Sequence, residues 1–467
     1  MTPSDDLAYL PLIELAERIR ARALSPVEAA EAMLARIAAL DSGLHAYATV
    51  TAERARIRAR EAEAEIAAGR YRGPLHGVPI AVKDLCFTRG VATAAGMAIH
   101  KDFVPPLDAT VVTRLELAGA VLLGKLQMTE GAFSEHHPSI TPPVNPWHPD
   151  YWTGVSSSGS GVATAAGLCY GSLGSDTGGS IRFPSTSCGI TGLKPTWGRV
   201  SRHSVFPLAD SLDHVGPMAR SAADCAAILG VIAGADPHDP TALIDPVPDY
   251  VGGLGGGVRG LRIGLDRALL ESVVEPEVSS VLLRALDVLA AAGAQIVDIR
   301  LPDLAGMAAM WTRACAAETA MAHKSTYPAR AAEYGPALKA LIDLGRGLSA
   351  PDYAEIQSER DRFKGRLRQV FAGVDVVALP ALPTAPMTIE RRAELRRDPA
   401  TASTVLLFTA PFDFSGSPTI TLPGGFAASG LPVGFQLIGR HLDEATLLRA
   451  GHVFQQATDW HRRRPPI

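Results

Sequence analysis

The sequence predicts an α/β protein built around a largely buried sheet. Apolar runs with the length of buried strands occur at residues 77–84 and 120–124, and a helical pattern lies between them at 109–117. The same alternation resumes after residue 261. The chain has 467 residues, of which 47% are hydrophobic and 20% are charged, and this composition is typical of a soluble globular protein with a large core.

Three helices are predicted before the first strand. Apolar residues recur at helical spacing over residues 10–22. Ser25 and Pro26 then supply an N-cap and a proline at the first position of a second helix. The apolar face of that helix comprises Ala29, Met33, Ile37 and Leu40. The third helix is predicted over residues 50–68, which are rich in Ala, Glu and Arg.

The second half of the chain repeats the alternation of strands and helices. The predicted strands are residues 261–265, 295–299, 374–379, 419–422 and 434–438. The predicted helical segments are residues 275–292, 303–371 and 444–457. No internal repeat and no domain linker interrupts this pattern, so a single domain is expected.

The charged residues and cysteines exclude several classes of function. The net charge of −4 is spread in mixed sign and would not attract nucleic acid. An odd count of five cysteines without a CxxC pair argues against a disulfide framework and against a structural zinc site. Two groups of arginines are interpreted as a solvated helix face and a charged tail. They are Arg391, Arg392, Arg396 and Arg397, and residues 462–464.

The N-terminus lacks the basic and apolar regions of a signal peptide. The longest apolar run, residues 225–235, is about half the length of a membrane span. We therefore expect a cytoplasmic protein without a membrane partner. No H-E-x-x-H motif is present, and the adjacent His136 and His137 are interpreted as a surface or packing pair, so no metal and no cofactor is expected.

The segment 153–198 is dense in Gly, Ser and Thr, which suggests backbone that approaches a ligand closely. No serine of the chain lies in the G-x-S-x-G elbow of the α/β-hydrolases. Within residues 174–184, consecutive small residues end in a serine. Their backbone N–H groups could form a nest for an oxyanion, or the segment could be a Gly-rich turn that caps a helix. The nest would comprise Thr177, Gly178, Gly179 and Ser180.

Residues 174–196 as a whole resemble the signature of the amidase signature family. Residues 77–84 are similar to the lysine strand of that family, and residues 154–160 to its Gly/Ser-rich segment. Further similarity covers residues 198–201, 213–217 and 434–439, and is weak between 240 and 400. The resemblance implies a large central mixed β-sheet covered by helices on both faces.

A single amidase signature domain over residues 1–467 follows from the resemblance. It would contain an N-terminal helical segment at 1–70, a signature core at 73–235 and a variable substrate-pocket segment at 303–400. The variable segment holds Met307, Met310, Trp311 and Tyr327, which favours an apolar or aryl substrate.

The resemblance also implies the roles of a catalytic triad. Ser180 corresponds to the nucleophile, and Ser156, 24 positions earlier, to a bridging serine held by a cis peptide bond. Lys83 corresponds to the base, which must be neutral to accept a proton, and burial would lower its pKa. The reaction would pass through an acyl-enzyme.

Two residues depart from the family pattern, because Val155 and Ser158 stand where glycine is common. The run of serines leaves Ser157 as a second candidate for the bridging role or as a residue near the substrate. Met128 and Phe133 are expected to line a wall of the site, although ordinary core packing is an equal alternative. Asp176 and Arg182 are expected to brace the loop that carries the nucleophile.

The resemblance leaves three functions open. The first is a free-standing amidase that acts on a small organic amide, aryl amide or carbamate. The second is the glutamine-hydrolysing A subunit of a tRNA-dependent amidotransferase, but the acidic residue expected before Phe408 and Thr409 is replaced by Leu406 and Leu407. The third is a non-enzymatic binding module, which would be expected to lose triad residues. The expected partner is a small-molecule amide, and a homodimer stays open as an assembly.

Overall fold

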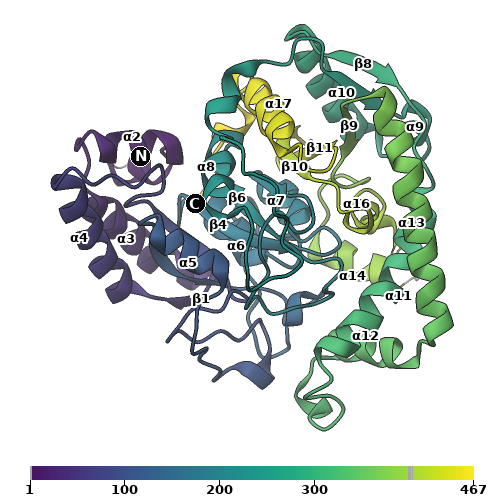
Figure 1. Cartoon of the computed structure of the whole chain (residues 1–467), viewed down its shortest axis with the longest axis horizontal. Helices are drawn as coiled ribbons and strands as arrows, with labels where there is room; N and C mark the ends of the chain where they lie inside the picture. Colours follow the sequence, from purple (N-terminus) through teal and green to yellow (C-terminus); the bar gives the residue numbers. More distant parts are fainter. Residues whose placement is uncertain (1–2, 398–400, 402) are drawn as a thin grey trace.

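The computed structural model describes residues 3–397, 401 and 403–467. Its centre is one sheet, which among these residues has eleven strands in the order β1–β3–β2–β4–β6–β5–β10–β11–β9–β7–β8 (Figure 1). The strands are β1 (Tyr47–Val50), β2 (Pro79–Lys83), β3 (Val121–Leu126), β4 (Gly171–Asp176), β5 (Thr191–Lys194), β6 (His214–Ala219), β7 (Arg262–Leu265), β8 (Gln295–Asp298), β9 (Val376–Pro380), β10 (Thr419–Phe426) and β11 (Pro432–Gly439).

The sheet is mixed, as the resemblance implies. Strand β2 pairs in parallel with both β3 and β4, and β7 pairs in parallel with β8 and β9. The six remaining pairings of neighbours are antiparallel and include the central series β4–β6–β5–β10–β11. Strands from residues far apart in the chain therefore lie side by side in the middle of the sheet.

Helices cover both faces of the sheet, which confirms the predicted fold class (Figure 1). They are α1 (Pro3–Ala8), α2 (Leu12–Arg20), α3 (Pro26–Leu44), α4 (Ala52–Ala67), α5 (Thr110–Leu117), α6 (Ser158–Ala165), α7 (Arg182–Cys188), α8 (Ala222–Ile232), α9 (Arg267–Val273), α10 (Pro276–Ala291), α11 (Leu304–Ala322), α12 (Pro336–Gly347), α13 (Ala350–Gly373), α14 (Ile389–Arg397), α16 (Ala410–Ser415) and α17 (Glu444–Gln456). In Figure 1, α2 to α4 lie at one end of the molecule and α11 to α13 at the other.

The start of α3 shows how local sequence determines an element. Ser25 Oγ accepts hydrogen bonds from the backbone N–H of Val27 and Glu28, and the Glu28 carboxylate accepts one from the N–H of Ser25. This is the reciprocal capping box, with Pro26 at the first helical position. The predicted helix start at Ser25–Pro26 is therefore confirmed.

Strands β4, β5 and β6 of the signature region were not predicted. Their residues are all buried, and β4 consists largely of glycine and serine, so it shows neither an apolar run nor an alternating pattern. Small side chains suit a central strand because the elements on both faces can approach the backbone closely. Strand β1 was missed as well, because its residues precede α4 without an intervening turn signal.

Most buried apolar side chains form one continuous core, and a second, smaller cluster comprises Phe183, Leu382, Met387 and Val405. The five cysteines are free thiols within buried positions, so no disulfide joins them. Over the residues described above, no helix is both long and apolar enough to cross a membrane.

Candidate active site

Lys83 is the last residue of β2, and its side chain is fully buried between strands and the Gly/Ser-rich segment. Its Nζ atom donates hydrogen bonds to Ser156 Oγ at 2.6 Å, to Ser175 Oγ at 2.8 Å and to Ser157 Oγ at 2.9 Å. Three hydroxyls therefore satisfy the three protons of an ammonium group, and no described carboxylate forms an ion pair with it.

Burial lowers the pKa of Lys83 to about 7, although the nearby negative charge of Asp176 acts in the opposite direction. An amine that loses its hydration favours the neutral form. A substantial fraction of Lys83 is therefore unprotonated near neutral pH and is able to accept a proton.

Ser156 and Ser157 precede helix α6 and differ in how their hydroxyls are engaged. The Val155–Ser156 peptide bond is cis, as the resemblance implies. Ser157 Oγ donates to the carbonyl oxygen of Ser175 at 3.1 Å and accepts from the N–H of Ser175 at 3.2 Å, so its hydroxyl is tied to β4. The Lys83 amine is the only hydrogen-bond partner of Ser156 Oγ among the described residues, which leaves the hydroxyl proton free to be donated elsewhere.

Ser180 lies on the loop between β4 and α7, and its backbone carbonyl accepts a hydrogen bond from the Ser157 N–H at 3.3 Å. This bond joins the loop to the segment that carries Ser156. The Ser180 side chain has no hydrogen-bond partner among the described residues. Ser180 is 9% exposed to solvent, whereas Lys83 is 0% exposed. Ser180 is thus the member of this cluster that reaches the open side of the site.

A buried ion pair braces the Ser180 loop, as the sequence predicts. Arg182 Nη2 lies 2.8 Å from Asp176 Oδ1, and it also pairs at 2.5 Å with Asp413 of helix α16. Asp176 further accepts the N–H of Gly179 at 2.6 Å and that of Ile181 at 2.9 Å. Burial disfavours the Asp176 charge, but the Arg182 guanidinium holds the pKa of the carboxyl well below its usual range.

Two distant residues orient the peptide groups of the same loop. Trp311 Nε1 donates to the carbonyl of Thr177 at 2.7 Å, and Thr409 Oγ1 donates to the carbonyl of Gly178 at 2.6 Å. The N–H groups of Thr177, Gly178 and Ser180 make no hydrogen bond within the part of the chain that the structure describes. The N–H of Gly179 differs, because it is donated to Asp176.

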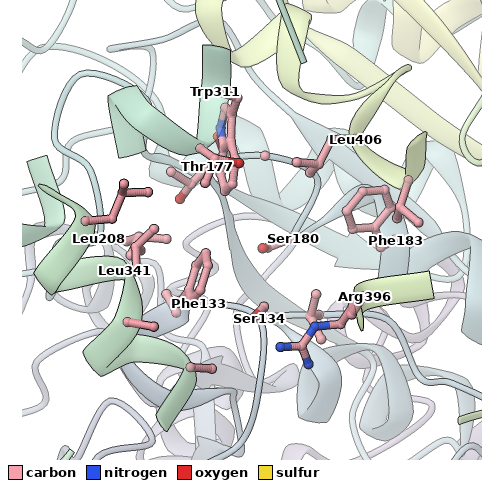
Figure 2. Close-up of a pocket in the computed structure, with 18 of the residues that line it drawn as sticks. Phe133, Ser134, Thr177, Ser180, Phe183, Leu208, Trp311, Leu341, Arg396 and Leu406 are labelled. Atoms are coloured by element: carbon pink, nitrogen blue, oxygen red, sulfur yellow. The ribbon is translucent and has the colours of Figure 1, made fainter. Parts of the chain in front are cut away.

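A cavity of about 360 Å³ opens above Ser180 (Figure 2). Its large apolar lining residues include Phe133, Phe183, Leu208, Trp311, Leu341 and Leu406. Its polar lining residues are Ser134, Thr177, Ser180, Thr312, Arg392 and Arg396. No Asp or Glu belongs to the lining among the described residues, so the wall combines an apolar surface with positive charge.

The predicted pocket residues divide between the wall and the interior. Phe133 lines the cavity, whereas Met128 is fully buried in the hydrophobic core and Ser157 lies behind the loop with Lys83. Of the aromatic and methionine residues noted in the variable segment, Trp311 reaches the cavity, and Met307, Met310 and Tyr327 pack on the core.

The arginines of α14 correct one expectation. Arg391 and Arg397 are exposed, as a solvated helix face requires, but Arg392 and Arg396 line the cavity. Ser175 was missed altogether as a partner of Lys83. The only signal for Ser175 was its position next to Asp176 within the Gly/Ser-rich segment.

Comparison with known proteins agrees with this architecture. The profile of the family described as Amidase matches residues 28–448. The chain belongs to the amidase signature family. It is 52% identical to the protein named "Putative amidase AmiD" of Mycobacterium bovis. The alignment of 463 residues covers 99% of this chain and 97% of that protein.

Two further members place the chain within the family. The A subunit of the glutamyl-tRNA(Gln) amidotransferase of Roseiflexus sp. (strain RS-1) is 41% identical, with 99% of each chain covered. The crystal structure of a bacterial aryl acylamidase of the amidase signature family superposes with a TM-score of 0.86 at 25% identity, with 97% of each chain covered. As a member of this family, the chain described here is a hydrolase of carbon–nitrogen bonds other than peptide bonds.

Proposed function

We propose that the chain hydrolyses a small organic amide by transferring its acyl group to Ser180, with Ser156 and Lys83 as a proton relay. The observation that carries this proposal is the buried amine of Lys83, whose pKa is lowered to about 7 and which lies 2.6 Å from Ser156 Oγ. Only the neutral amine can accept a proton, and a lysine with an ordinary pKa would be almost fully protonated at pH 7.

The reaction has two steps. Ser180 Oγ forms a bond to the amide carbon, and its proton passes through the Ser156 hydroxyl to Lys83. The same proton returns to the nitrogen of the leaving group as the C–N bond breaks, which leaves an acyl-enzyme. Water, deprotonated by the same relay, then releases the carboxylic acid and restores the Ser180 hydroxyl. The free hydroxyl proton of Ser156 supports its place in the relay over that of Ser157, which is bonded to the Ser175 carbonyl.

The oxyanion of the tetrahedral intermediate would be held by backbone N–H groups of residues 177–180. Those of Thr177, Gly178 and Ser180 are available, and the bonds from Trp311 and Thr409 to neighbouring carbonyls fix the orientation of the peptide groups. Gly179 would contribute only if its N–H were shared with Asp176.

The cavity supports an aryl amide or carbamate as the substrate class, because apolar side chains, three of them aromatic, form most of its wall. Trp311 and Phe133 offer flat apolar surfaces on which an aryl ring can pack. The structural similarity to an aryl acylamidase agrees with this class.

The alternative, the A subunit of a tRNA-dependent amidotransferase, is supported by the 41% identity to such a protein. Glutamine carries an α-ammonium group that needs an anionic partner when it leaves water. The cavity wall offers no carboxylate among its described residues, and Leu406 lines it where the resemblance leads one to expect an acidic residue. The free-standing amidase is therefore favoured.

The proposal is tested by Ser180→Ala, with Ser134→Ala as the matched control, since Ser134 also lines the cavity but lies outside the hydrogen-bond cluster. Each purified protein is assayed alone on anilides, primary amides, carbamates and glutamine. Ser180→Ala should lower kcat by at least about 10³-fold with the fold retained, and a fluorophosphonate should label Ser180 in the wild type. Retained turnover in Ser180→Ala, or an adduct on another residue, would refute the proposal.

A further inference from the structure

Helix α14 carries arginines that the hydrolytic relay does not use. Arg391 is exposed and pairs with Glu394 at 2.9 Å, as a solvated arginine would. One turn further, Arg396 lines the cavity but forms an ion pair with Glu135, so its charge is compensated. Arg392 differs from both, because it lines the cavity and has no ion-pair partner among the described residues.

The guanidinium of Arg392 is held in a partly dry position. Its Nη1 atom is buried and has no hydrogen-bond partner among the described residues, and its Cζ atom lies 5.3 Å from the centre of the Trp152 ring. Burial, with no neighbouring charge to offset it, lowers the pKa of Arg392 to about 10. Arg392 is half-buried, and a cation that has lost part of its hydration without a counterion carries a cost in free energy. The described part of the chain provides no anion for Arg392, so the guanidinium is available to a bound anion.

Arg392 and Ser180 line the same cavity. Figure 2 shows Ser180 between two sides of the cavity, with Leu208 and Leu341 on one side and Phe183 and Arg396 on the other. Arg392 belongs to the same helix as Arg396, one turn away. A substrate that reaches both sides would thus meet an apolar wall on one side and the arginines of α14 beside Phe183 on the other.

We propose that Arg392 binds a carboxylate of the substrate, so that the enzyme acts on amides with an apolar group on one side of the scissile bond and a carboxylate on the other. This inference rests on the proposed function of Ser180. A guanidinium presents parallel N–H groups that match the two oxygens of a carboxylate, and the contact with the Trp152 ring helps to hold the group in position. Because the uncharged wall residues cannot compensate Arg392, a neutral substrate would leave it unpaired.

The test uses two substrate pairs, each with a carboxylate replaced by an isopropyl group of similar shape. The acyl-side pair is the succinic acid mono-4-nitroanilide and the 4-nitroanilide of 4-methylpentanoic acid. The amine-side pair is 4-acetamidobenzoate and 4-isopropylacetanilide. The measured quantity is the ratio of kcat/KM for the anionic substrate to that for the neutral one, and the pair with the higher ratio shows which side of the scissile bond faces Arg392.

In Arg392→Gln this ratio should fall by about 10- to 100-fold for one of the two pairs, as expected from loss of a charge-assisted hydrogen bond. Arg392→Lys keeps the positive charge but not the paired N–H groups of the guanidinium, so the ratio should fall less than in Arg392→Gln. Arg391→Gln, the neighbouring exposed arginine, should leave the ratio unchanged. The inference would be overturned if the ratio in Arg392→Gln stayed within about twofold of the wild-type ratio for both pairs. Such a change is smaller than the loss expected from any hydrogen bond to a charged group.

A binding measurement separates this inference from the proposed function. In the Ser180→Ala background, calorimetric titration with succinic acid mono-4-nitroanilide and with 4-acetamidobenzoate needs no turnover. Adding Arg392→Gln should weaken binding of one of these anions by about tenfold or more. Equal affinity for both anions with and without Arg392 would refute the carboxylate site even if amide hydrolysis is confirmed. Loss of affinity without hydrolysis of any amide by the wild type would refute the proposed function alone.

Discussion

Ser175 Oγ lies 2.8 Å from Lys83 Nζ, at the end of the strand that pairs in parallel with the lysine strand. The amine therefore contacts a third hydroxyl besides those of Ser156 and Ser157. A hydroxyl that accepts a hydrogen bond from an ammonium group stabilises the charged form. We therefore expect the Ser175 hydroxyl to favour the charged form of Lys83 and to hold the amine in place.

Ser175→Ala should therefore change the pH dependence of the enzyme as well as its rate. Without this acceptor the ammonium form of Lys83 is less stable, so the acidic limb of the kcat/KM profile should move to lower pH, while poorer positioning lowers the plateau by about tenfold. Ser160→Ala is the matched control, since Ser160 Oγ is buried but donates to the Leu173 carbonyl instead. An unmoved limb in Ser175→Ala would show that Ser175 does not stabilise the charged amine.

Lys83 itself determines the expected pH profile of the wild type. The neutral amine is required, so kcat/KM should fall about tenfold per pH unit below a pKa of about 7 and level off above it. With its unperturbed pKa, only about 1 in 3,000 of the lysines would be neutral at pH 7. Lys83→Ala should lose amide hydrolysis because it removes the base. Lys83→Arg should lose it as well, because a guanidinium stays protonated.

The comparison of an amide with an activated ester sharpens this prediction. The ester has a better leaving group and needs less proton delivery, so loss of Lys83 should affect it less than the amide. Equal and small losses on both substrates would mean that Lys83 is structural. A limb near neutrality that survives Lys83→Ala would point to a different base.

The two adjacent serines are distinguished by their hydrogen bonds. Ser156→Ala removes the hydroxyl that has a free proton, and amide turnover should fall by about 10³-fold or more. Ser157→Ala removes a hydroxyl that links Lys83 to the backbone of Ser175, and the loss should be about tenfold, with a lower unfolding midpoint. Kinetics and thermal unfolding of both variants measure this, and a larger kinetic loss in Ser157→Ala would exchange the two roles.

The Asp176–Arg182 pair should be important for stability. Both side chains are completely buried, so Arg182→Met leaves the Asp176 carboxylate without the cation that pairs with it. Breaking such a pair is expected to lower the free energy of unfolding by about 3–5 kcal/mol. Arg18→Met, which breaks the exposed pair with Glu14, should change it by less than about 1 kcal/mol. Urea denaturation compares the two, and similar small losses would contradict the bracing role.

Much of the fold was predictable because its signals are local. The helix that begins after Ser25 depends on a cap and a proline within four residues, and the buried strand ending at Lys83 depends on a short apolar run. The strands of the signature region were missed because Gly- and Ser-rich segments such as Gly171–Asp176 carry no hydrophobic period. Their strand conformation comes from pairing with neighbours on both sides of the sheet.

The sequence alone determined the amidase signature and the candidate residues Lys83, Ser156 and Ser180, because each lies in a contiguous motif. The tertiary structure decided what surrounds them. Trp311 reaches Thr177 across 134 residues, Arg182 reaches Asp413 across 231, and Arg392 enters the cavity from a helix whose composition suggests a solvated surface. Such contacts depend on the order of strands in the sheet, and a local pattern of residues carries no information about which distant segments that order brings together.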